Sequence, residues 1–483
     1  MMRSDDRPVI LWLRRDLRLT DHPALTAACA GGRPVIPVFI LDDQVAALGA
    51  AAQWRLGQGL EVFARTLADR GSRLILRRGP AQEVLQALIA ESGAGAVHWT
   101  RAYDPISRER DGAIKSALKA QGIDARSFPG SLLFEPWTVQ TGTGGPYRVF
   151  TPMWKTVRGR DVAPPLPAPG RICAPEAWPV SDRLQDWALG TAMRRGAAVL
   201  AAHSAPGEAA AQDRLARFID EGIARYEQRR DIPGVEGTSG LSEYLALGEI
   251  APQRCWHAAF AARERGGAGA ETFFKELVWR EFAYHLMYHS PQILTGNWRS
   301  EWDDFPWNTD RSDPRVIAWT RGRTGMPFVD AAMREMYVTG RMHNRGRMIV
   351  ASYLTKHLMT HWRIGMDWFA EHLTDWDPAS NAMGWQWSAG SGPDATPYFR
   401  VFNPESQLAK FDRDGSYRRA WIAEGQVSPP DTALDYFRAI PLCWGLAPGD
   451  PYPAPIVSAQ EGRRLALEAY QNRSVAGAHD GKT

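Results

Sequence analysis

The chain has 483 residues, of which 44% are hydrophobic and 23% charged, and its formal net charge is +3. These values are typical of a soluble globular protein of about two or three domains, and the charge is too small to establish a nucleic-acid partner. Four widely spaced cysteines without a CxxC pair argue against a disulfide scaffold or a zinc site, and no apolar run suits a signal peptide or a membrane span, so we expect a cytoplasmic protein.

Residues 1–133 alternate between short apolar runs and longer amphipathic segments. The apolar runs, which we expect to be buried parallel strands, are Val9–Leu13, Val35–Leu41, Leu74–Leu76 and Ala96–Trp99. The amphipathic segments, which we expect to be helices, are Pro23–Ala30, Gln53–Arg70, Ala81–Glu91 and Arg108–Gln121. This alternation predicts an α/β domain in which helices cover both faces of a parallel sheet.

After residue 133 the alternation stops. Residues 161–179 are rich in proline, which predicts an interdomain linker within 134–205. Over 206–472 apolar residues recur at three- and four-residue spacing without strand-like runs, which predicts an all-helical domain. Its clearest helical segments are Glu271–His289, Phe328–Tyr337 and Arg345–His361. Residues 473–483 are expected to be a frayed C-terminus.

The first segment that could carry a functional site runs from residue 226 to residue 242 and reads YEQRRDIPGVEGTSGLS. Thr238, Ser239 and Gly240 precede an apolar helical segment. Small hydroxyl residues at a helix start leave backbone N–H groups that can receive a phosphate. The simpler interpretation of the same pattern is ordinary helix N-capping.

The second segment contains Glu276, Trp279 and Arg280, whose spacing places them on one helix face. A carboxylate beside an indole suits the binding of a flat heterocycle. The alternative is a helix with one core tryptophan and a surface ion pair.

The third segment, MHNRGRM, places Asn344, Arg347 and Met348 on one helix face. Gly346 within a helix costs about 1 kcal/mol relative to alanine, which indicates the close approach of a ligand or of another helix. The alternative is a basic surface turn.

The 27 residues from His361 to Trp387 read HWRIGMDWFAEHLTDWDPASNAMGWQW. So many tryptophans form either a core or a functional aromatic site. Asp375 and Asp377 lack a third metal ligand at suitable spacing, and Pro378 predicts that Asp377 caps a helix, so no metal site is expected. Arg347 and Asp375 are natural partners for a buried ion pair beside a cofactor.

Taken in order, these segments resemble the photolyase/cryptochrome family, most closely its bacterial cyclobutane pyrimidine dimer photolyases. The resemblance covers nearly the whole chain and rests on LWLRRDLRLTDHPAL, YEQRRDIPGVEGTSGLS, ELVWREF, TGMPFVDAAMREM, MHNRGRM, DWDPASNAMGWQW and PYFRVFNPESQ. It implies a Rossmann-like antenna domain followed by a helical domain that holds FAD. It also implies light-driven repair of dimers in UV-damaged DNA, in which photoexcited reduced FAD passes an electron to a flipped-out dimer.

The resemblance further implies roles for individual residues. FAD would be bound by Tyr226, Thr238, Ser239, Gly240, Leu241, Ser242, Arg280, Asn344, Arg347, Asp375, Asp377 and Asn381. Within this set Arg347 and Asp375 would form a salt bridge against the isoalloxazine, and Asn381 would lie at the flavin N5. Electrons would reach the flavin through Trp385, Trp362 and Trp307.

For the substrate, the resemblance implies that Glu276, Asn344 and Asn381 are catalytic. Residues in contact with the lesion or the DNA would be Arg230, Glu276, Trp279, Arg345, Met348, Trp387, Gln407 and Lys410. A dimer has lost normal stacking and pairing, so flipping it out costs only about a few kcal/mol. The basic residues would contact flanking phosphates and make binding depend on salt.

Some alternatives stay open. The (6-4) photolyases carry histidines where this chain has Asn344 and Met348, and DASH cryptochromes lack the tryptophan at Trp387. Gly240 stands where many members of the family have arginine. A blue-light photoreceptor that signals through protein partners is the competing function, and a light-independent flavin oxidoreductase is a third. For the antenna we expect methenyltetrahydrofolate rather than 8-hydroxy-deazaflavin, although residues 103–111 lack the Asn-Glu pair that binds folate in some members. A monomer that does not bind membranes is expected.

Overall fold

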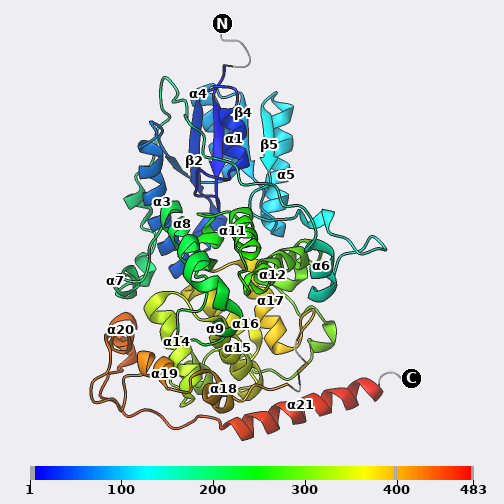
Figure 1. The fold of residues 1–483 in the computed structure, drawn as a ribbon, viewed down its shortest axis with the longest axis vertical. Helices are drawn as coiled ribbons and strands as arrows, with labels where there is room; N and C mark the ends of the chain where they lie inside the picture. The colour runs from blue at the N-terminus through cyan, green and yellow to red at the C-terminus, as the bar shows by residue number, and fades with distance from the viewer. Residues whose placement is uncertain (1–5, 396, 399, 480–483) are drawn as a thin grey trace. The chain divides into compact units, whose positions relative to one another are not determined.

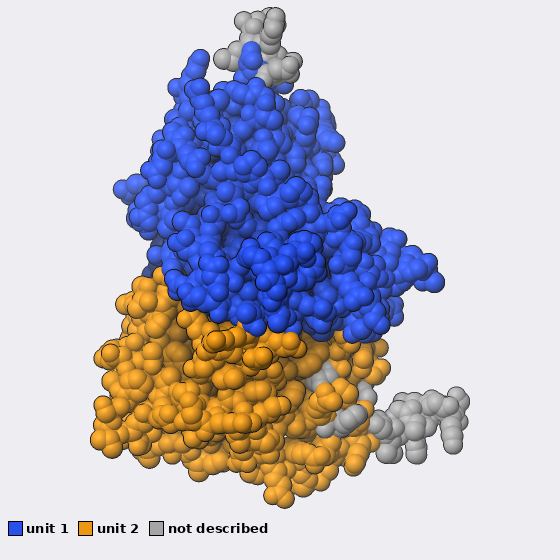
Figure 2. All heavy atoms as spheres, in the orientation of Figure 1, with its two compact units in different colours: residues 1–192, 205–224, 239–291 blue, residues 193–204, 225–238, 292–483 orange. Residues whose placement is uncertain are grey.

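The computed structural model describes residues 6–395, 397–398 and 400–479, with side chains up to residue 472. The chain forms two compact units (Figure 2). Unit 1 comprises residues 1–192, 205–224 and 239–291, and unit 2 comprises residues 193–204, 225–238 and 292–483. Because the chain passes between the units several times, neither is a single continuous segment. The domain boundaries expected at residues 133, 205 and 472 remain predictions.

Unit 1 contains a parallel sheet with the order β3-β2-β1-β4-β5. Strands β2, β4 and β5 of this sheet are labelled in Figure 1. Central strand β1 pairs with β2 and β4, so that Val9 lies opposite both Val35 and Ala96. The strands are β1 Val9–Leu13, β2 Val35–Leu41, β3 Ile75–Arg78, β4 Ala96–Thr100 and β5 Asp124–Phe128. The expected parallel α/β class is confirmed.

Strand β5 is the strand that the sequence pattern did not predict. It reads DARSF and pairs only with β4. An edge strand exposes one side to water and tolerates charged residues, which removes the apolar run that marks a buried strand.

The sheet is packed on both faces because β1 and β2 alternate their apolar side chains between two cores. One core joins Val9 and Leu11 to α1 and α3. The other joins Ile10 and Trp12 to α4 and α5. The helices of unit 1 are α1 Pro23–Cys29, α2 Asp43–Ala46, α3 Ala50–Ala68, α4 Ala81–Ser92, α5 Pro105–Ala120, α6 Phe150–Val157, α8 Glu208–Arg217, α10 Ser242–Leu247, α11 Pro252–Glu264 and α12 Ala270–His289.

The proline-rich segment expected to be a linker is bound along unit 1. The Asp21 N–H donates to the Leu166 carbonyl at 2.7 Å, and the Val35 N–H donates to the Cys173 carbonyl at 2.8 Å. Ile172 is buried in the core beneath α1 and α3. Prolines leave backbone carbonyls available while lacking N–H groups, which suits a segment that follows the edge of another element.

Unit 2 is helical. Besides its helices, its described residues contain one isolated β-bridge, between Asn308 and Thr360. Its helices are α7 Gly196–Ala201, α9 Tyr226–Arg229, α13 Pro314–Thr320, α14 Pro327–Thr339, α15 Asn344–Ser352, α16 Trp362–His372, α17 Pro378–Ala389, α18 Pro404–Phe411, α19 Ser416–Trp421, α20 Asp431–Ala439 and α21 Ala459–His479. No described helix of the chain is both long enough and apolar enough to cross a membrane.

The helix expected over Arg345–His361 is interrupted. Helix α15 ends at Ser352, a π-helical turn spans Tyr353–His357, and Met359 adopts a left-handed φ of 49°. The His361 side chain then caps α16 by accepting a hydrogen bond from the Arg363 N–H. Apolar periodicity alone did not reveal this break, because the buried residues continue through the turn.

The motif TGMPFVDAAMREM has a structural role. The buried Asp330 carboxylate accepts hydrogen bonds from the Thr324 N–H and hydroxyl, both at 2.7 Å, and from the Tyr452 hydroxyl at 2.6 Å. One turn later, buried Arg334 donates to both oxygens of Glu424. A buried charge must be paired or hydrogen-bonded, and these bonds anchor α14, on which α15 packs.

Candidate active site

Arg347 and Asp375 form the expected ion pair within unit 2. The Arg347 Nη2 donates to both carboxylate oxygens, at 2.7 and 3.0 Å, and the Nε donates to the Met342 carbonyl at 2.9 Å. The Asp375 side chain is 3% exposed, whereas that of Arg347 is 29% exposed. The buried carboxylate therefore fixes a guanidinium that keeps part of its surface open to a ligand.

Gly346 is explained by helix packing. A Cβ added at this position would lie 2.9 Å from the Ala332 Cβ on α14. The sequence indicated that either a ligand or another helix comes close to Gly346. The structure shows the approach of another helix. This close packing of α15 on α14 fixes the position of Arg347 relative to α14.

A half-buried acid lies next to the start of α15. The Glu335 carboxylate on α14 accepts hydrogen bonds from the Tyr417 hydroxyl at 2.6 Å and from the His343 N–H at 3.2 Å. Burial raises the pKa of Glu335 to about 7, against the opposing effect of these bonds and of Arg347 and Arg341. Burial also lowers the pKa of His343 to about 4, which leaves its Nδ1 free to accept the Arg345 N–H as the cap of α15.

Two more of the expected cofactor residues lie at the N-terminal end of α17. The Asp377 carboxylate accepts the Ser380 N–H at 2.8 Å, so the predicted helix cap is confirmed. One turn later the Asn381 amide donates to the Met366 carbonyl on α16 at 2.9 Å. This bond fixes the orientation of the Asn381 side chain relative to α16.

The three expected relay tryptophans are buried in one core of unit 2. Trp385 is 2% exposed and lies against Gly365 on α16, where any side chain would overlap its ring. Gly365 follows Trp362, which is 0% exposed, by one helical turn. The His361 ring lies between Trp362 and Trp307, with centroids 5.3 Å from each indole. Burial lowers the pKa of His361 to about 4, so no positive charge separates these two indoles at neutral pH.

Residues expected at the DNA surface of unit 2 have partners within that unit. Arg345 forms an ion pair with Asp231 at 2.7 Å, and its guanidinium lies 4.4 Å from the centroid of Phe411. The Arg230 guanidinium lies 5.4 Å from the Tyr226 ring centroid. Asp231 was not singled out from the sequence, although its place directly after two arginines was a signal. The remaining expected DNA residues of unit 2 are half-buried or exposed, namely Met348, Trp387, Gln407 and Lys410.

Three further expected residues lie on α12 of unit 1. Trp279 stacks on Phe150 of α6, with centroids 3.8 Å apart and planes 4° from parallel. Arg280 donates to the Ser131 carbonyl at 2.8 Å and lies over the Tyr284 ring. Phe150 was missed from the sequence, because its contact with Trp279 spans more than a hundred residues. Glu276 is half-buried on the same helix.

The segment that contains Ser239 and Gly240 does not cap α10. The N-cap of that helix is Leu241, and no side chain caps it. Gly240 has a φ of 63°, and a Cβ there would lie 2.7 Å from the Arg214 Nε, which donates to the Ser239 carbonyl. Arg214 of α8 thus occupies the space beside Gly240. Ordinary N-capping by these residues, the simpler interpretation of the pattern, is wrong.

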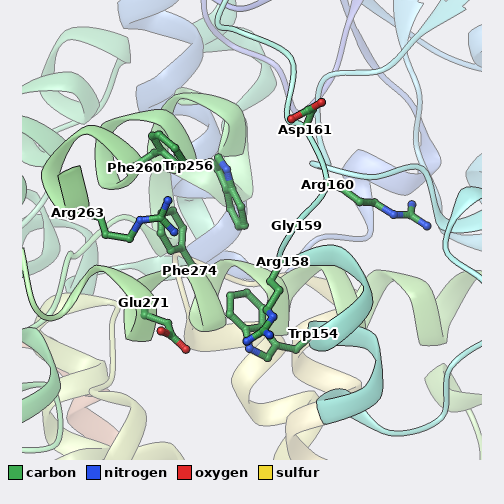
Figure 3. A pocket seen from close by; sticks show the side chains of 10 residues that line it. All are labelled: Trp154, Arg158, Gly159, Arg160, Asp161, Trp256, Phe260, Arg263, Glu271 and Phe274. Carbon is green, nitrogen blue, oxygen red and sulfur yellow. The ribbon is translucent and has the colours of Figure 1, made fainter.

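Unit 1 also contains an aromatic pocket that the sequence did not reveal (Figure 3). Its volume is about 420 Å³, and Trp154 of α6 and Trp256 of α11 both line it. Trp256 lies 4.4 Å from Phe274, and the Arg263 guanidinium lies 4.5 Å from Phe260. The remaining lining residues are mostly charged: Arg158, Gly159, Arg160, Asp161 and Glu271. The signal in the sequence was the spacing of Trp256, Phe260 and Arg263 along one helix face.

The chain was compared with known proteins. Residues 9–170 match the DNA photolyase family model, and residues 273–472 match the FAD binding domain of DNA photolyase. A deoxyribodipyrimidine photo-lyase of Agrobacterium fabrum is 45% identical over 96% of this chain and 97% of its own length. The chain belongs to the photolyase/cryptochrome family.

Other members of the photolyase/cryptochrome family support the same assignment. The crystal structure of a bacterial class III photolyase from Agrobacterium tumefaciens superimposes with a TM-score of 0.90 at 42% identity, over 98% of each chain. Cryptochrome-1 of Arabidopsis thaliana is 33% identical over 95% of this chain and 70% of its own length. The expected family and fold class are confirmed, and the chain carries the family's FAD-binding domain.

Proposed function

We propose that this protein repairs cyclobutane pyrimidine dimers in DNA with light, by electron transfer to a flipped-out dimer. One arrangement in unit 2 carries the proposal. The Arg347 guanidinium is partly exposed, the Asn381 amide is held by a hydrogen bond, and tryptophans are buried nearby in the same unit, within a region that matches the family's FAD-binding domain. The similar proteins from Agrobacterium fabrum and Escherichia coli are both named deoxyribodipyrimidine photo-lyase.

The exposure of the Arg347–Asp375 pair in unit 2 is compatible with FAD binding. Asp375 is buried while its partner Arg347 stays partly exposed, so the charge is positioned and still accessible to a ligand. Bound FAD supplies light-driven one-electron transfer. Arg347 and Asp375 would hold the isoalloxazine, and Asn381 would present its amide at the flavin N5. The other residues proposed to bind FAD are Tyr226, Thr238, Asn344 and Asp377 in unit 2, and Ser239 through Ser242 and Arg280 in unit 1.

The chain's own residues would also bind the lesion. Trp279, already stacked on Phe150, would present a rigid indole, and Trp387 would present a second one. Each stacked base contributes about 1–3 kcal/mol. Glu276 would hydrogen-bond the pyrimidine edge, and Asn344 and Met348 would also contact the lesion. Flanking phosphates would be bound by Arg230, Arg345, Gln407 and Lys410.

The antenna chromophore has two candidate places in unit 1. In open parallel sheets, ligands bind beyond the carboxyl ends of the strands where the strand order reverses, here between β1 and β4. In this chain Arg14 pairs there with Asp111 at 2.7 Å, and Arg110 pairs with Asp42 and Asp111. Both guanidinium groups lie over Trp12. A deazaflavin bound there would have to displace these paired charges, which disfavours it.

We place the antenna instead in the aromatic pocket. Its volume of about 420 Å³ falls within the range of about 300–1,000 Å³ usual for small-molecule sites. Indoles at Trp154 and Trp256 suit a flat heterocycle, and arginines at 158, 160 and 263 suit an anionic tail. Methenyltetrahydrofolate has both features. Folate titration of the Trp256→Ala variant, with Trp137→Ala elsewhere in unit 1 as control, tests this placement by the change in absorption.

The function is tested by illuminating the purified protein with an oligonucleotide that contains one thymine dimer. We expect loss of the dimer that requires blue light, with undamaged oligonucleotide and darkness as controls. Light-driven flavin reduction without dimer loss would instead support a photoreceptor, the alternative suggested by similarity to Cryptochrome-1. Cytoplasmic location and action as a monomer remain expectations.

A further inference from the structure

Phe150 belongs to a cluster of three rings that α6 and α12 form within unit 1. Its ring stacks on Trp279, with centroids 3.8 Å apart and planes 4° from parallel. Phe282 meets both rings edge-on, with its centroid 6.0 Å from Phe150 and 5.8 Å from Trp279. Phe150 is 7% exposed, whereas Trp279 is half-buried. One face of the Trp279 indole is therefore covered by a buried phenyl ring, while another part of the indole stays open.

The segment that leads into α6 is tied to α12, the helix that carries Trp279. The Tyr147 N–H donates to the His285 Nε2 at 2.9 Å, and the Tyr147 hydroxyl is hydrogen-bonded to the Thr156 hydroxyl on α6 at 2.7 Å. His285 is 1% exposed, and burial lowers its pKa to about 4, so the neutral ring can accept this bond at neutral pH. Because Phe150 is the first residue of α6, these bonds hold it against its stacking partner.

We propose that Phe150 is a positioning residue for lesion recognition, which fixes the plane of the Trp279 indole before the dimer arrives. The proposal rests on the proposed function, in which Trp279 binds the lesion, and Phe150 acts only through Trp279. A mobile indole would lose its rotational freedom when the dimer binds, and this loss would weaken binding. Undamaged DNA flips out its bases less readily than a dimer, so the effect of Phe150 should be confined to DNA that contains the lesion.

Ordinary core packing is the competing explanation for the buried Phe150 ring, and it predicts a different result. Loss of a buried phenylalanine lowers the stability of a protein wherever that residue lies in a core. Phe63 on α3 is 3% exposed and lies in a core whose described members include neither Phe150 nor Trp279. Phe63 therefore serves as the matched control, because its loss should affect stability without affecting the indole.

The test compares Phe150→Leu with Phe63→Leu in the FAD-loaded protein. Both changes replace a buried ring by an aliphatic side chain, and circular dichroism and FAD content verify the fold. Fluorescence anisotropy then measures binding of an oligonucleotide with one thymine dimer and of its undamaged counterpart. We expect Phe150→Leu to bind the dimer about two- to tenfold more weakly, the effect of ordering one side chain, and to bind undamaged DNA unchanged. Phe63→Leu, and Phe150→Tyr, which keeps the ring, should bind both as the unmutated protein does.

A double-mutant cycle shows whether Phe150 acts through Trp279. In that case Phe150→Leu adds no further loss of dimer affinity in a Trp279→Ala background. Unchanged dimer affinity in Phe150→Leu, or the same loss in both backgrounds, overturns the positioning role and leaves the proposed function intact. If Trp279→Ala itself leaves dimer binding unchanged, the proposed lesion site is wrong, and the role of Phe150 falls with it.

A measurement without DNA tests the position of the indole directly. In protein labelled with fluorotryptophan, the fluorine resonance of Trp279 is identified by its absence from Trp279→Phe. A phenyl ring stacked at 3.8 Å shifts this resonance upfield. We expect the shift in the unmutated protein and in Phe63→Leu, and its loss in Phe150→Leu. An unshifted resonance in the unmutated protein overturns the proposal, whether or not any variant folds.

Discussion

Single side chains of the candidate site depend on partners that hold them in place. Arg347 is oriented by Asp375 and by the Met342 carbonyl, and Asn381 by the Met366 carbonyl. Such bonds reduce the freedom that the side chain would lose on binding a ligand. Preorganisation of this kind would favour the oriented FAD binding that we propose.

Asp375→Asn should weaken FAD binding because it removes the negative partner of Arg347. A charge-assisted hydrogen bond contributes about 1.5–3 kcal/mol, so we expect a loss of affinity of about tenfold or more. Fluorescence titration of the protein without FAD measures it. Asp367→Asn, at the exposed ion pair with Arg311, is the control and should have no effect. Equal affinity of both variants would contradict the role of the Arg347–Asp375 pair.

Gly365→Ala tests whether Trp385 needs the space beside α16. The added methyl group would overlap the buried indole, and overpacking costs about 1–3 kcal/mol. We expect a lower free energy of unfolding in urea together with slower light-driven flavin reduction. Gly112→Ala, within α5 and without neighbours near the added Cβ, should be neutral or stabilising by about 0.4–1 kcal/mol. A stable Gly365→Ala variant would refute the contact.

At the scale of elements, α17 presents different side chains on its different faces. Trp385 and Trp387 are two residues apart and therefore point about 200° apart around the helix. Trp385 is buried in the core of unit 2, while Trp387 is half-buried. In the proposed function, one indole of this helix would serve electron transfer and the other would bind the lesion.

Trp387→Ala should weaken binding of dimer-containing DNA while leaving FAD bound. Loss of one stacked base should reduce the binding free energy by about 1–3 kcal/mol, which a fluorescence anisotropy titration at fixed salt measures.

Trp385→Phe should slow flavin reduction by light but spare repair by protein that has been reduced beforehand. Release of FAD by Trp387→Ala, or unchanged photoreduction in Trp385→Phe, would reverse these assignments.

At the scale of the whole molecule, ionisable groups that are wholly or partly removed from water link stability to pH. Burial lowers the pKa to about 4 for His98, His285, His343, His357, His361 and His372. Between about pH 6.5 and 4 the unfolded chain binds more protons at these positions, so acidification favours unfolding. Glu281 and Glu335, with pKa values raised to about 7, act in the opposite sense between about pH 4.5 and 7.

The six histidines outnumber the five acids whose pKa burial raises, which are Asp21, Glu249, Glu281, Asp330 and Glu335, so we expect the stability of the protein to fall as the pH is lowered from about 7 to 5. Both units contain such histidines. Calorimetry at the two pH values measures the change, and His372→Phe should reduce it relative to the unmutated protein. A melting temperature that rises on acidification would show that the buried acids dominate instead.

Local patterns predicted much of this structure. Alternating apolar runs located β1 to β4, and motifs in order along the chain identified the family. Spacing and charge predicted the Arg347–Asp375 pair and the Asp377 cap, because these depend on helix geometry and on residue types. Residue roles toward FAD and DNA stay predictions, since they depend on molecules outside the chain.

What the sequence by itself determined is therefore the class of fold, the helices and strands with strong periodicity, and the family. Only the tertiary structure decided which distant residues meet: Phe150 with Trp279, Trp154 with Trp256 around one pocket, and Trp302 with Tyr470. The physical reason is that periodicity records which face of an element is buried. The neighbour that covers this face is chosen by packing between segments far apart in the chain.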